Sequence, residues 1–175
     1  MLRSLINVTF VYVPREDRIM TAINAGRPDA WSCWLTRRLS LAVLERTASY
    51  LVSKSDLAQR APADFRGEAI AFERDAAIAK TAGAMSVTPP AVLQSSASGA
   101  ELAERLTISQ HGDAFRLELR GLSEEGAAGM VKGDELQRLL QMLQVEVGKA
   151  GWLVVPGKPQ GAPAPAAADP KPLRN

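Results

Sequence analysis

The chain has 175 residues, of which 46% are hydrophobic, and its formal net charge is +2. This length and composition are typical of a single globular domain that buries its own core. The only cysteine, Cys33, cannot form an internal disulfide, no Cys and His spacing resembles a zinc site, and no apolar run reaches the roughly 20 residues that span a bilayer. We therefore expect a cytoplasmic protein without a membrane segment, a metal ion or a cofactor.

Charge is distributed unevenly along the chain. Basic residues outnumber acidic ones in residues 1–60, and the balance reverses in residues 101–153. A basic half of this kind can attract nucleic acid or an acidic partner, or it can be neutralised by the acidic half of the same protein. Composition leaves both interpretations open.

Three strands are predicted in the first part of the chain. Residues 5–13 are rich in β-branched and aromatic side chains, a proline and acidic turn follows at residues 14–17, and residues 18–25 resume the extended pattern, so the two runs form a hairpin. Residues 30–36 then alternate. Trp31, Cys33 and Leu35 share one face of this third strand, and Ser32, Trp34 and Thr36 share the other.

A helix is predicted over residues 37–54. The hydroxyl of Thr36 is placed to cap its first turn, and its apolar face is wide enough to be largely covered. Arg37 and Arg38 would lie in the first turn, where the helix dipole disfavours cations. We therefore expect the acidic pair in the turn of residues 14–17 to hold these arginines.

A second helix is predicted over residues 62–82. Apolar residues recur along it at alternating spacings of four and three, which gives a seam that can pair with another helix. The seam consists of Phe65, Ala69, Phe72, Ala76 and Ala79. It can pack against the protein's own sheet, which we rank slightly first, or it can pair two subunits. Gly83 is placed to end the helix, and prolines and small polar residues predict a loop over residues 86–100.

The second half of the chain repeats the order of the first. Residues 104–110 and 115–121 form a predicted hairpin, and residues 128–132 a short third strand. In the second of these strands Phe115, Leu117 and Leu119 face the core, and Arg116, Glu118 and Arg120 face water. A helix follows from Glu135, with an apolar stripe made of Leu136, Leu139, Leu140, Leu143, Val147 and Ala150. Gly151 is expected to end it, and Trp152 to fold back on the core.

We therefore predict an α+β fold of two three-stranded antiparallel units, each followed by an amphipathic helix, with a further helix between them. The units, residues 1–54 and 101–153, form one domain over residues 1–153 and are joined by residues 55–100. Their shared order is compatible with a βββα repeat. Residues 154–175 are rich in proline and alanine with almost nothing to bury, which predicts a disordered tail.

No catalytic constellation is evident in the sequence. His111, the only histidine, falls in a hairpin turn, where a solvated side chain is far more common than a catalytic one. Cys33 shares its strand face with Trp31 and Leu35, so we expect a small core side chain and not a nucleophile. The carboxylates fall in turns and on helix surfaces, and there is no glycine-rich phosphate loop. We therefore expect a protein that is not an enzyme.

Trp34 is the aromatic residue of most interest, because it lies opposite the face that carries Cys33. Proteins that hold single-stranded nucleic acid combine such an aromatic with nearby cations, and stacking contributes about 1–3 kcal/mol per base. Arg18, Arg37 and Arg38 are the candidate phosphate partners. The alternative is that Trp34 is covered, either by the helix of residues 62–82 or by a second subunit.

The sequence resembles two groups of known proteins. The run VPREDR followed by WLTRRL resembles the signature of an uncharacterised family of small proteobacterial proteins, whose C-terminal helix ends in a small residue and Trp, here KAGW. It covers most of residues 5–152 and implies no function. The repeated layout of sheet and helix is also similar to that of Whirly and Pur-type single-strand-binding proteins, but this chain has three predicted strands per half where those families use four.

Two functions remain as hypotheses. The first is a protein-interaction or assembly component that acts through the seam from Phe65 to Ala79, either as a homodimer or within a larger assembly. The second is a single-stranded nucleic-acid-binding module that uses Trp34 with Arg18, Arg37 and Arg38.

Overall fold

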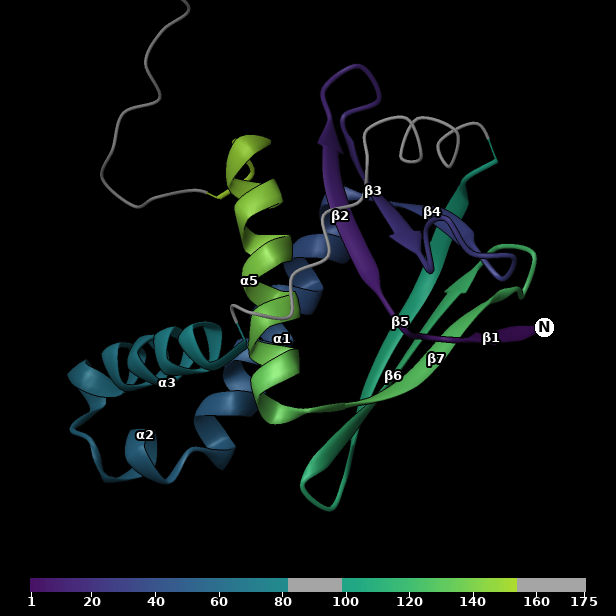
Figure 1. The fold of residues 1–175 in the computed structure, drawn as a ribbon. Coiled ribbons are helices and arrows are strands. Elements are labelled where there is room, and N and C mark those ends of the chain that lie inside the picture. The colour runs from purple at the N-terminus through teal and green to yellow at the C-terminus, as the bar shows by residue number, and fades with distance from the viewer. Residues whose placement is uncertain (82–98, 154–175) are drawn as a thin grey trace, which may run out of the picture.

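The computed structural model describes residues 1–81 and 99–153. The predictions made for Gly83, for most of the loop of residues 86–100 and for the tail of residues 154–175 lie outside the described residues. The predicted α+β class is confirmed, since a single mixed sheet and a layer of helices make up the described part of the chain (Figure 1).

The elements follow one another along the chain as β1 (Leu2–Ser4), β2 (Val8–Val13), β3 (Arg18–Ile23), β4 (Trp31–Leu35), α1 (Arg37–Lys54), α2 (Asp56–Arg60), a 3-10 turn (Ala63–Phe65), α3 (Arg66–Thr81), β5 (Glu101–His111), β6 (Ala114–Gly121), β7 (Gly126–Lys132) and α5 (Gly133–Lys149). None of the helices among these residues is both long and apolar enough to cross a membrane.

The seven strands form one sheet in the order β1-β7-β6-β5-β4-β3-β2. Neighbouring strands within β2–β4 and within β5–β7 are antiparallel, whereas β4 and β5 are parallel and join the two halves. Each half is therefore a three-stranded meander followed by a helix, as the sequence predicted. The short strand β1 was not predicted, and it pairs in parallel with β7 at the far edge.

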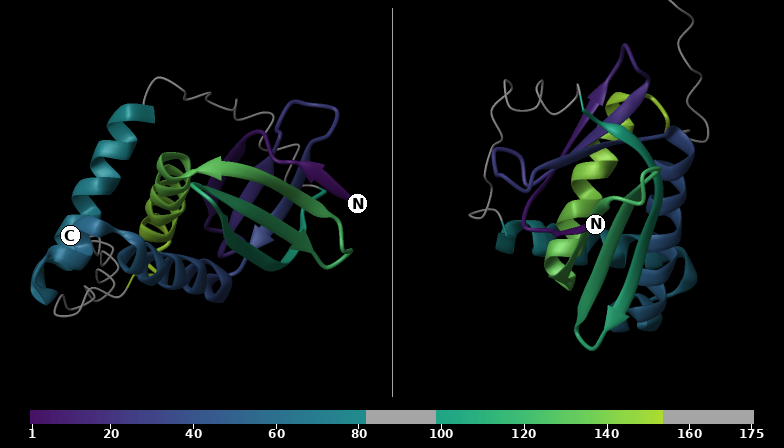
Figure 2. Two further views of the ribbon diagram at one scale, coloured as in Figure 1. Left: turned by 90° about the horizontal axis from the view of Figure 1, so that it is seen from below. Right: turned by 90° about the vertical axis from the view of Figure 1, so that its right-hand side faces the viewer.

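The helices lie on one side of this strongly twisted sheet (Figure 2). Helix α5 packs across β2, β6 and β7. Four residues of its predicted apolar stripe, Leu136, Leu140, Leu143 and Val147, are buried, and the other two, Leu139 and Ala150, are half-buried. Helix α1 starts at the expected place, because Thr36 Oγ1 accepts the amide of Leu39 at 3.2 Å. Helix α3 packs against α5 and forms the outermost part of the helical layer.

Two expected boundaries are wrong. The opening run is not one strand from Leu5 to Val13, because Asn24 breaks it: its Oδ1 accepts the amides of Ile6 and Asn7, and its Nδ2 donates to Ser4 O. This bonding turns the chain from the β7 edge to the β3 edge, and Ile6 becomes exposed.

The predicted helix of residues 62–82 is also misplaced at its start. Pro62 is extended, with φ −54° and ψ 152°, and it lies before the first helical residue as an N-cap. A 3-10 turn intervenes, and α3 begins at Arg66. The segment before Pro62 forms the short helix α2, which the sequence pattern did not predict.

Glu101 connects the two halves of the sheet. Its carboxylate accepts the indole N–H of Trp31 at 2.9 Å, and both the amide and the hydroxyl of Ser123 at 2.8 Å. Burial alone would raise the pKa of Glu101, but the hydrogen bonds from Ser123 and Trp31, together with the charge of Arg3, hold that pKa below its ordinary value. The first strand of the second half is thereby fixed to the last strand of the first half.

The edge strand β2 is covered by α5. The carboxylate of Glu146, which is buried, accepts the backbone amide of Tyr12 at 2.8 Å and also pairs with Lys149 at 2.6 Å. Beyond the helix, Trp152 folds back as predicted. Its ring packs edge-on against Tyr12, with centroids 5.7 Å apart, and its indole donates to Asp17 at 3.2 Å.

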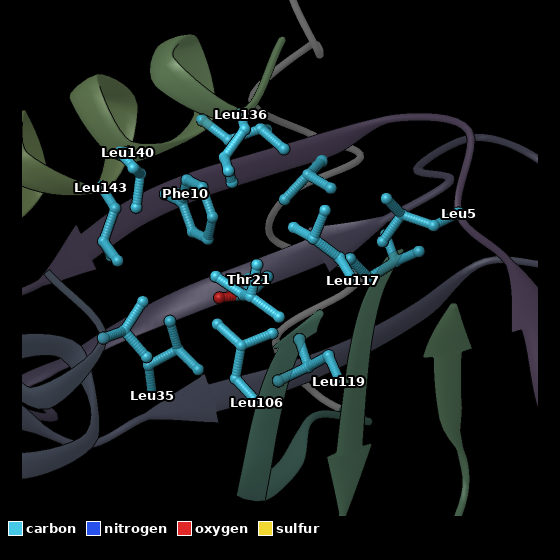
Figure 3. A pocket seen from close by; sticks show the side chains of 15 residues that line it. Leu5, Phe10, Thr21, Leu35, Leu106, Leu117, Leu119, Leu136, Leu140 and Leu143 are labelled. Atoms are coloured by element: carbon cyan, nitrogen blue, oxygen red, sulfur yellow. The ribbon is translucent and has the colours of Figure 1, made fainter. Parts of the chain in front are cut away.

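A small cavity of about 40 Å³ lies in the core between the sheet and α5 (Figure 3). Thr21 is the only polar residue among the fifteen that line it, and its hydroxyl has no hydrogen-bond partner in the described part of the chain. A space this small and apolar is a packing defect and not a ligand site.

Candidate functional site

The structure places Trp34 in a row of apolar residues that crosses four strands. Val11 is paired with Met20, Met20 with Trp34, and Trp34 with Leu102. Met20 is buried and Trp34 is half-buried. Trp34 is thus on the face opposite Cys33, as expected, but it is embedded in a row of neighbours and does not stand alone on an open surface.

The three candidate arginines are exposed at the same end of the sheet as Trp34. Arg18 begins β3 two residues before Met20, on the same face as Trp34, and Arg37 and Arg38 begin α1 directly after β4. None of the ion pairs formed among residues 1–81 and 99–153 involves these arginines.

The acidic pair in the turn of residues 14–17 was expected to hold Arg37 and Arg38. Asp17 is used otherwise, because its Oδ1 accepts hydrogen bonds from the hydroxyl of Tyr12 at 3.1 Å and from the indole of Trp152. The prediction of an ion pair for the arginines is therefore wrong for Asp17, and no contact of Glu16 replaces it within the described residues.

Cys33 and His111 lie in different surroundings, one in the core and the other at the exposed end of a strand. Cys33 is completely buried, and burial, together with the charge of Glu101, raises the pKa of its thiol. His111 is exposed at the end of β5, where its Nε2 lies 3.3 Å from Ser109 Oγ. Cys33 is therefore a core residue, as expected from its strand face.

The predicted seam of α3 does not pack against the sheet, so the interpretation ranked first from the sequence is wrong. Phe72 is 68% exposed and Phe65 54% exposed, and Ala76 and Ala79 are exposed as well. Only Ala69 is half-buried.

A different stripe of the same helix faces the protein. Ile70 and Ala77 are buried against the helical layer, and between them Arg74 donates to Gln144 of α5 at 2.6 Å. The sequence contains both stripes, each at helical spacing, and periodicity alone cannot decide which one meets the rest of the protein. The larger side chains of the seam face outward.

A cleft of about 580 Å³ lies beside the seam, between α3, the end of α1, strand β6 and the start of α5. Its lining includes Phe72 and Ala76 of the seam, with Leu51, Lys54, Ser55, Asp56, Glu73, Ala77, Lys80, Phe115, Gly133, Asp134 and Gln137. The exposed seam therefore forms one wall of a concave surface of the size that takes small ligands or single anchoring side chains.

The floor of the cleft is apolar except for one carboxamide. Leu51, Ala77 and Phe115 are buried, and so is Gln137, whose oxygen has no hydrogen-bond partner within the described residues. A buried polar atom left without a partner costs about 1–3 kcal/mol. This oxygen is covered in the structure, so the floor offers its hydrogen-bonding capacity only when the carboxamide of Gln137 turns.

The rim of the cleft is charged. Lys80 pairs with Asp134, and Ser55 donates its hydroxyl to Glu73 at 2.8 Å. Lys54 lies over the ring of Tyr50, with 5.8 Å from its Nζ to the ring centroid. The cleft was not predicted, because its walls come from five elements, α1, α2, α3, β6 and α5, which only the tertiary fold brings together.

A second groove, of about 680 Å³, has a mixed polar and apolar lining made of Leu41, Leu44, Glu45, Ala48, Arg74, Leu140, Gln144, Trp152 and Leu153. Leu153 is the last residue that the structure describes. The groove therefore adjoins the point at which the described chain stops.

Comparison of the chain with models of protein families, with curated protein sequences and with solved structures gives no match. The resemblance of VPREDR and WLTRRL to an uncharacterised proteobacterial family therefore stays a prediction, as does the architectural likeness to Whirly and Pur-type proteins.

Proposed function

We propose that this chain is a protein-interaction component that acts by binding and not by catalysis, and that it binds its partner through the exposed seam of α3 and the cleft beside it. The observation that carries this proposal is the orientation of α3. The helix packs on the protein through its second stripe, with Ile70 and Ala77, and this leaves the seam with Phe72 facing outward. Large apolar side chains presented together at the wall of a cleft are typical of protein-binding surfaces.

The free energy that a partner would gain by covering Phe72 supports a binding role for this exposed side chain. Covering a side chain of the size of phenylalanine contributes about 1.5–3 kcal/mol, and Phe72 keeps 68% of its surface exposed. A partner that covered Phe72 and filled the apolar floor next to it would gain a central anchor of the kind that dominates binding energy at interfaces.

Photo-crosslinking tests this proposal. A photoreactive amino acid is placed at position 72 of the full chain, which is expressed in the cells of its natural host, and a matched variant carries it at position 122. Leu122 is a suitable control because it is also an exposed apolar residue, at 62%, but lies in the turn between β6 and β7.

We expect a discrete crosslinked species from position 72 and none from position 122. The species should disappear when Ala76→Glu places a charge on the seam, with the fold checked by circular dichroism. Adducts that are equal at both positions, or absent at both, contradict the proposal.

A second candidate function is supported by the arginines at the other end of the molecule. Arg18, Arg37 and Arg38 are exposed without ion pairs in the described part of the chain, and Arg18 shares a sheet face with Trp34. Cations near an aromatic side chain favour single-stranded nucleic acid.

Titration with a fluorescent single-stranded oligonucleotide at low and at moderate salt tests this candidate. Phosphate contacts release counterions, so binding should weaken as salt rises, and it should weaken again with Trp34→Ala or with Arg37→Ala and Arg38→Ala together. Absence of binding at low salt removes this candidate and leaves the interaction through α3.

A further inference from the structure

The two flanks of the α3 seam differ. On one side, Glu73 and Lys80 face the body of the protein, where they contact Ser55 and Asp134. On the other side, Glu68 and Asp75 are exposed, and neither forms an ion pair within residues 1–81 and 99–153. The flank that an approaching partner would meet is therefore acidic.

A second copy of this chain does not fit that flank. In an antiparallel pair of α3 helices, Glu68 of one copy would face Asp75 of the other, and the same contact would occur twice. In a parallel pair, Glu68 would face Glu73 and Asp75 would face Lys80, but Glu73 and Lys80 already contact Ser55 and Asp134 on the body of the protein. Like charges therefore disfavour an antiparallel homodimer through α3, and a parallel homodimer would have to break the contacts that Glu73 and Lys80 make within the chain.

The shape of the seam fits a helix. Ala69, Ala76 and Ala79 are small and let another helix backbone approach closely, while Phe72 projects between them. From Ala69 to Ala79 the seam is about 15 Å long, close to three helical turns. A spacing that alternates between four and three residues is matched by a helix with apolar residues at i, i+3, i+4 and i+7.

The cleft provides a place for one large side chain of such a helix. An aromatic group that entered past Phe72 would contact Leu51 and Phe115 on the floor. The terminal torsion of glutamine is soft, so the carboxamide of Gln137 can turn its unpartnered oxygen toward a donor on that group. Tryptophan has both an aromatic body and an N–H donor.

From these observations we propose that the partner is an amphipathic helix of another protein, which carries lysine or arginine beside its apolar stripe and inserts a tryptophan into the cleft. This inference rests on the proposed function, because it names the kind of partner that the α3 surface binds. The acidic flank, Glu68 and Asp75, then selects the partner by charge, and the seam and the cleft provide the affinity.

Two synthetic helical peptides test the inference. Both have the same apolar stripe with a central tryptophan; one has lysine at the flanking positions, and the other has glutamate. Their binding to the full chain is measured by fluorescence anisotropy, and the oligomeric state of the chain is measured by sedimentation velocity.

The lysine peptide should bind about tenfold more tightly than the glutamate peptide, because two attractive contacts replace two repulsive ones. The double variant Glu68→Lys and Asp75→Lys should reverse this preference. Phe72→Ala should weaken both peptides, and Leu122→Ala, at an equally exposed apolar position, should leave both unchanged.

Other outcomes overturn the inference and separate it from the proposed function. Equal binding of the two peptides, or a preference that the double variant does not reverse, shows that the partner does not need basic residues beside its apolar stripe. Self-association that Phe72→Ala abolishes makes a second copy the partner. If neither peptide binds while position 72 still crosslinks a protein, the partner is not such a helix although the proposed function stands; if crosslinking fails as well, both fall.

Discussion

The side chain of Glu101 occupies the space directly above Gly121. A Cβ atom on Gly121 would overlap the carboxyl group of Glu101, which is held in place by Trp31 and Ser123. Glycine is required here because of a close approach between β5 and β6, where the ladder is also irregular between Ala103 and Arg105. The first prediction follows from this contact.

Gly121→Ala should lower the free energy of unfolding by about 2 kcal/mol, because the displaced carboxylate loses hydrogen bonds on both sides. Gly148→Ala is the matched control. No atom lies within 4 Å of a Cβ atom built on Gly148, and replacement of glycine within a helix stabilises by about 0.5–1 kcal/mol. Urea unfolding measures both, and equal effects of the two substitutions would contradict the contact.

The second prediction concerns pH. The pKa of Glu101 is lower in the folded protein than its ordinary value of 4.5, so the folded state favours the ionised carboxylate. Its contribution to stability is complete above pH 4.5 and is lost as the pH falls through the lower folded value. Glu101→Gln should therefore reduce stability at pH 7 and reduce the further loss between pH 5 and pH 3, as measured by urea midpoints. An unchanged loss over that range would show that other carboxylates cause it.

The third prediction concerns Asn24. Its backbone has a positive φ of 51°, and its buried carboxamide makes four hydrogen bonds, with Ile6, Asn7, Ser4 and Asp29. Asn24→Ala should cost about 3 kcal/mol, because it removes these bonds and places alanine in a left-handed conformation. Asn24→Gly should cost about 1 kcal/mol less than alanine, since glycine tolerates that conformation.

Asn24→Asp distinguishes the acceptor role of the carboxamide from its donor role. Aspartate can still accept the amides of Ile6 and Asn7, but its second oxygen would face Ser4 O and the carboxylate of Asp29. We expect it to be as damaging as alanine at pH 7. A stability close to that of the unaltered chain would contradict this assignment of the amide.

The fourth prediction is a gain in stability. Thr21→Val keeps the shape of the side chain and removes a buried hydroxyl that has no partner among the described residues, so it should raise the free energy of unfolding by about 1 kcal/mol. Ser55→Ala is a suitable comparison, because Ser55 is buried and its hydroxyl donates to Glu73 and accepts the amide of Ala58. Thermal unfolding would distinguish a gain at position 21 from a loss at position 55.

Local patterns predicted the elements whose outcome depends on local physics. The cap at Thr36, the alternation of β6 and the stripe of α5 each appear within a few residues of sequence, and each is present in the structure. The predictions that failed concern features that depend on contacts between residues far apart in the sequence. The break before Val8 is caused by Asn24, which lies sixteen residues later.

The candidate surface was predicted only in part. The sequence predicts the seam as a set of residues at helical spacing, but its outward orientation depends on Ile70, Ala77 and Arg74 packing against α5. The cleft depends on Phe115 and Gln137 reaching the same place from different ends of the second half. Neither residue could be assigned to a site without the tertiary arrangement.

The hydrogen bond from the amide of Tyr12 to the carboxylate of Glu146 limits how this protein can assemble through its sheet. An open edge strand invites another strand to extend the sheet, and here a helix side chain already takes the position of the incoming carbonyl on β2. The opposite edge is formed by β1, which has only three residues. Addition of a further strand is therefore disfavoured at both edges of the sheet, so contacts with other molecules would have to use its faces or the helical layer.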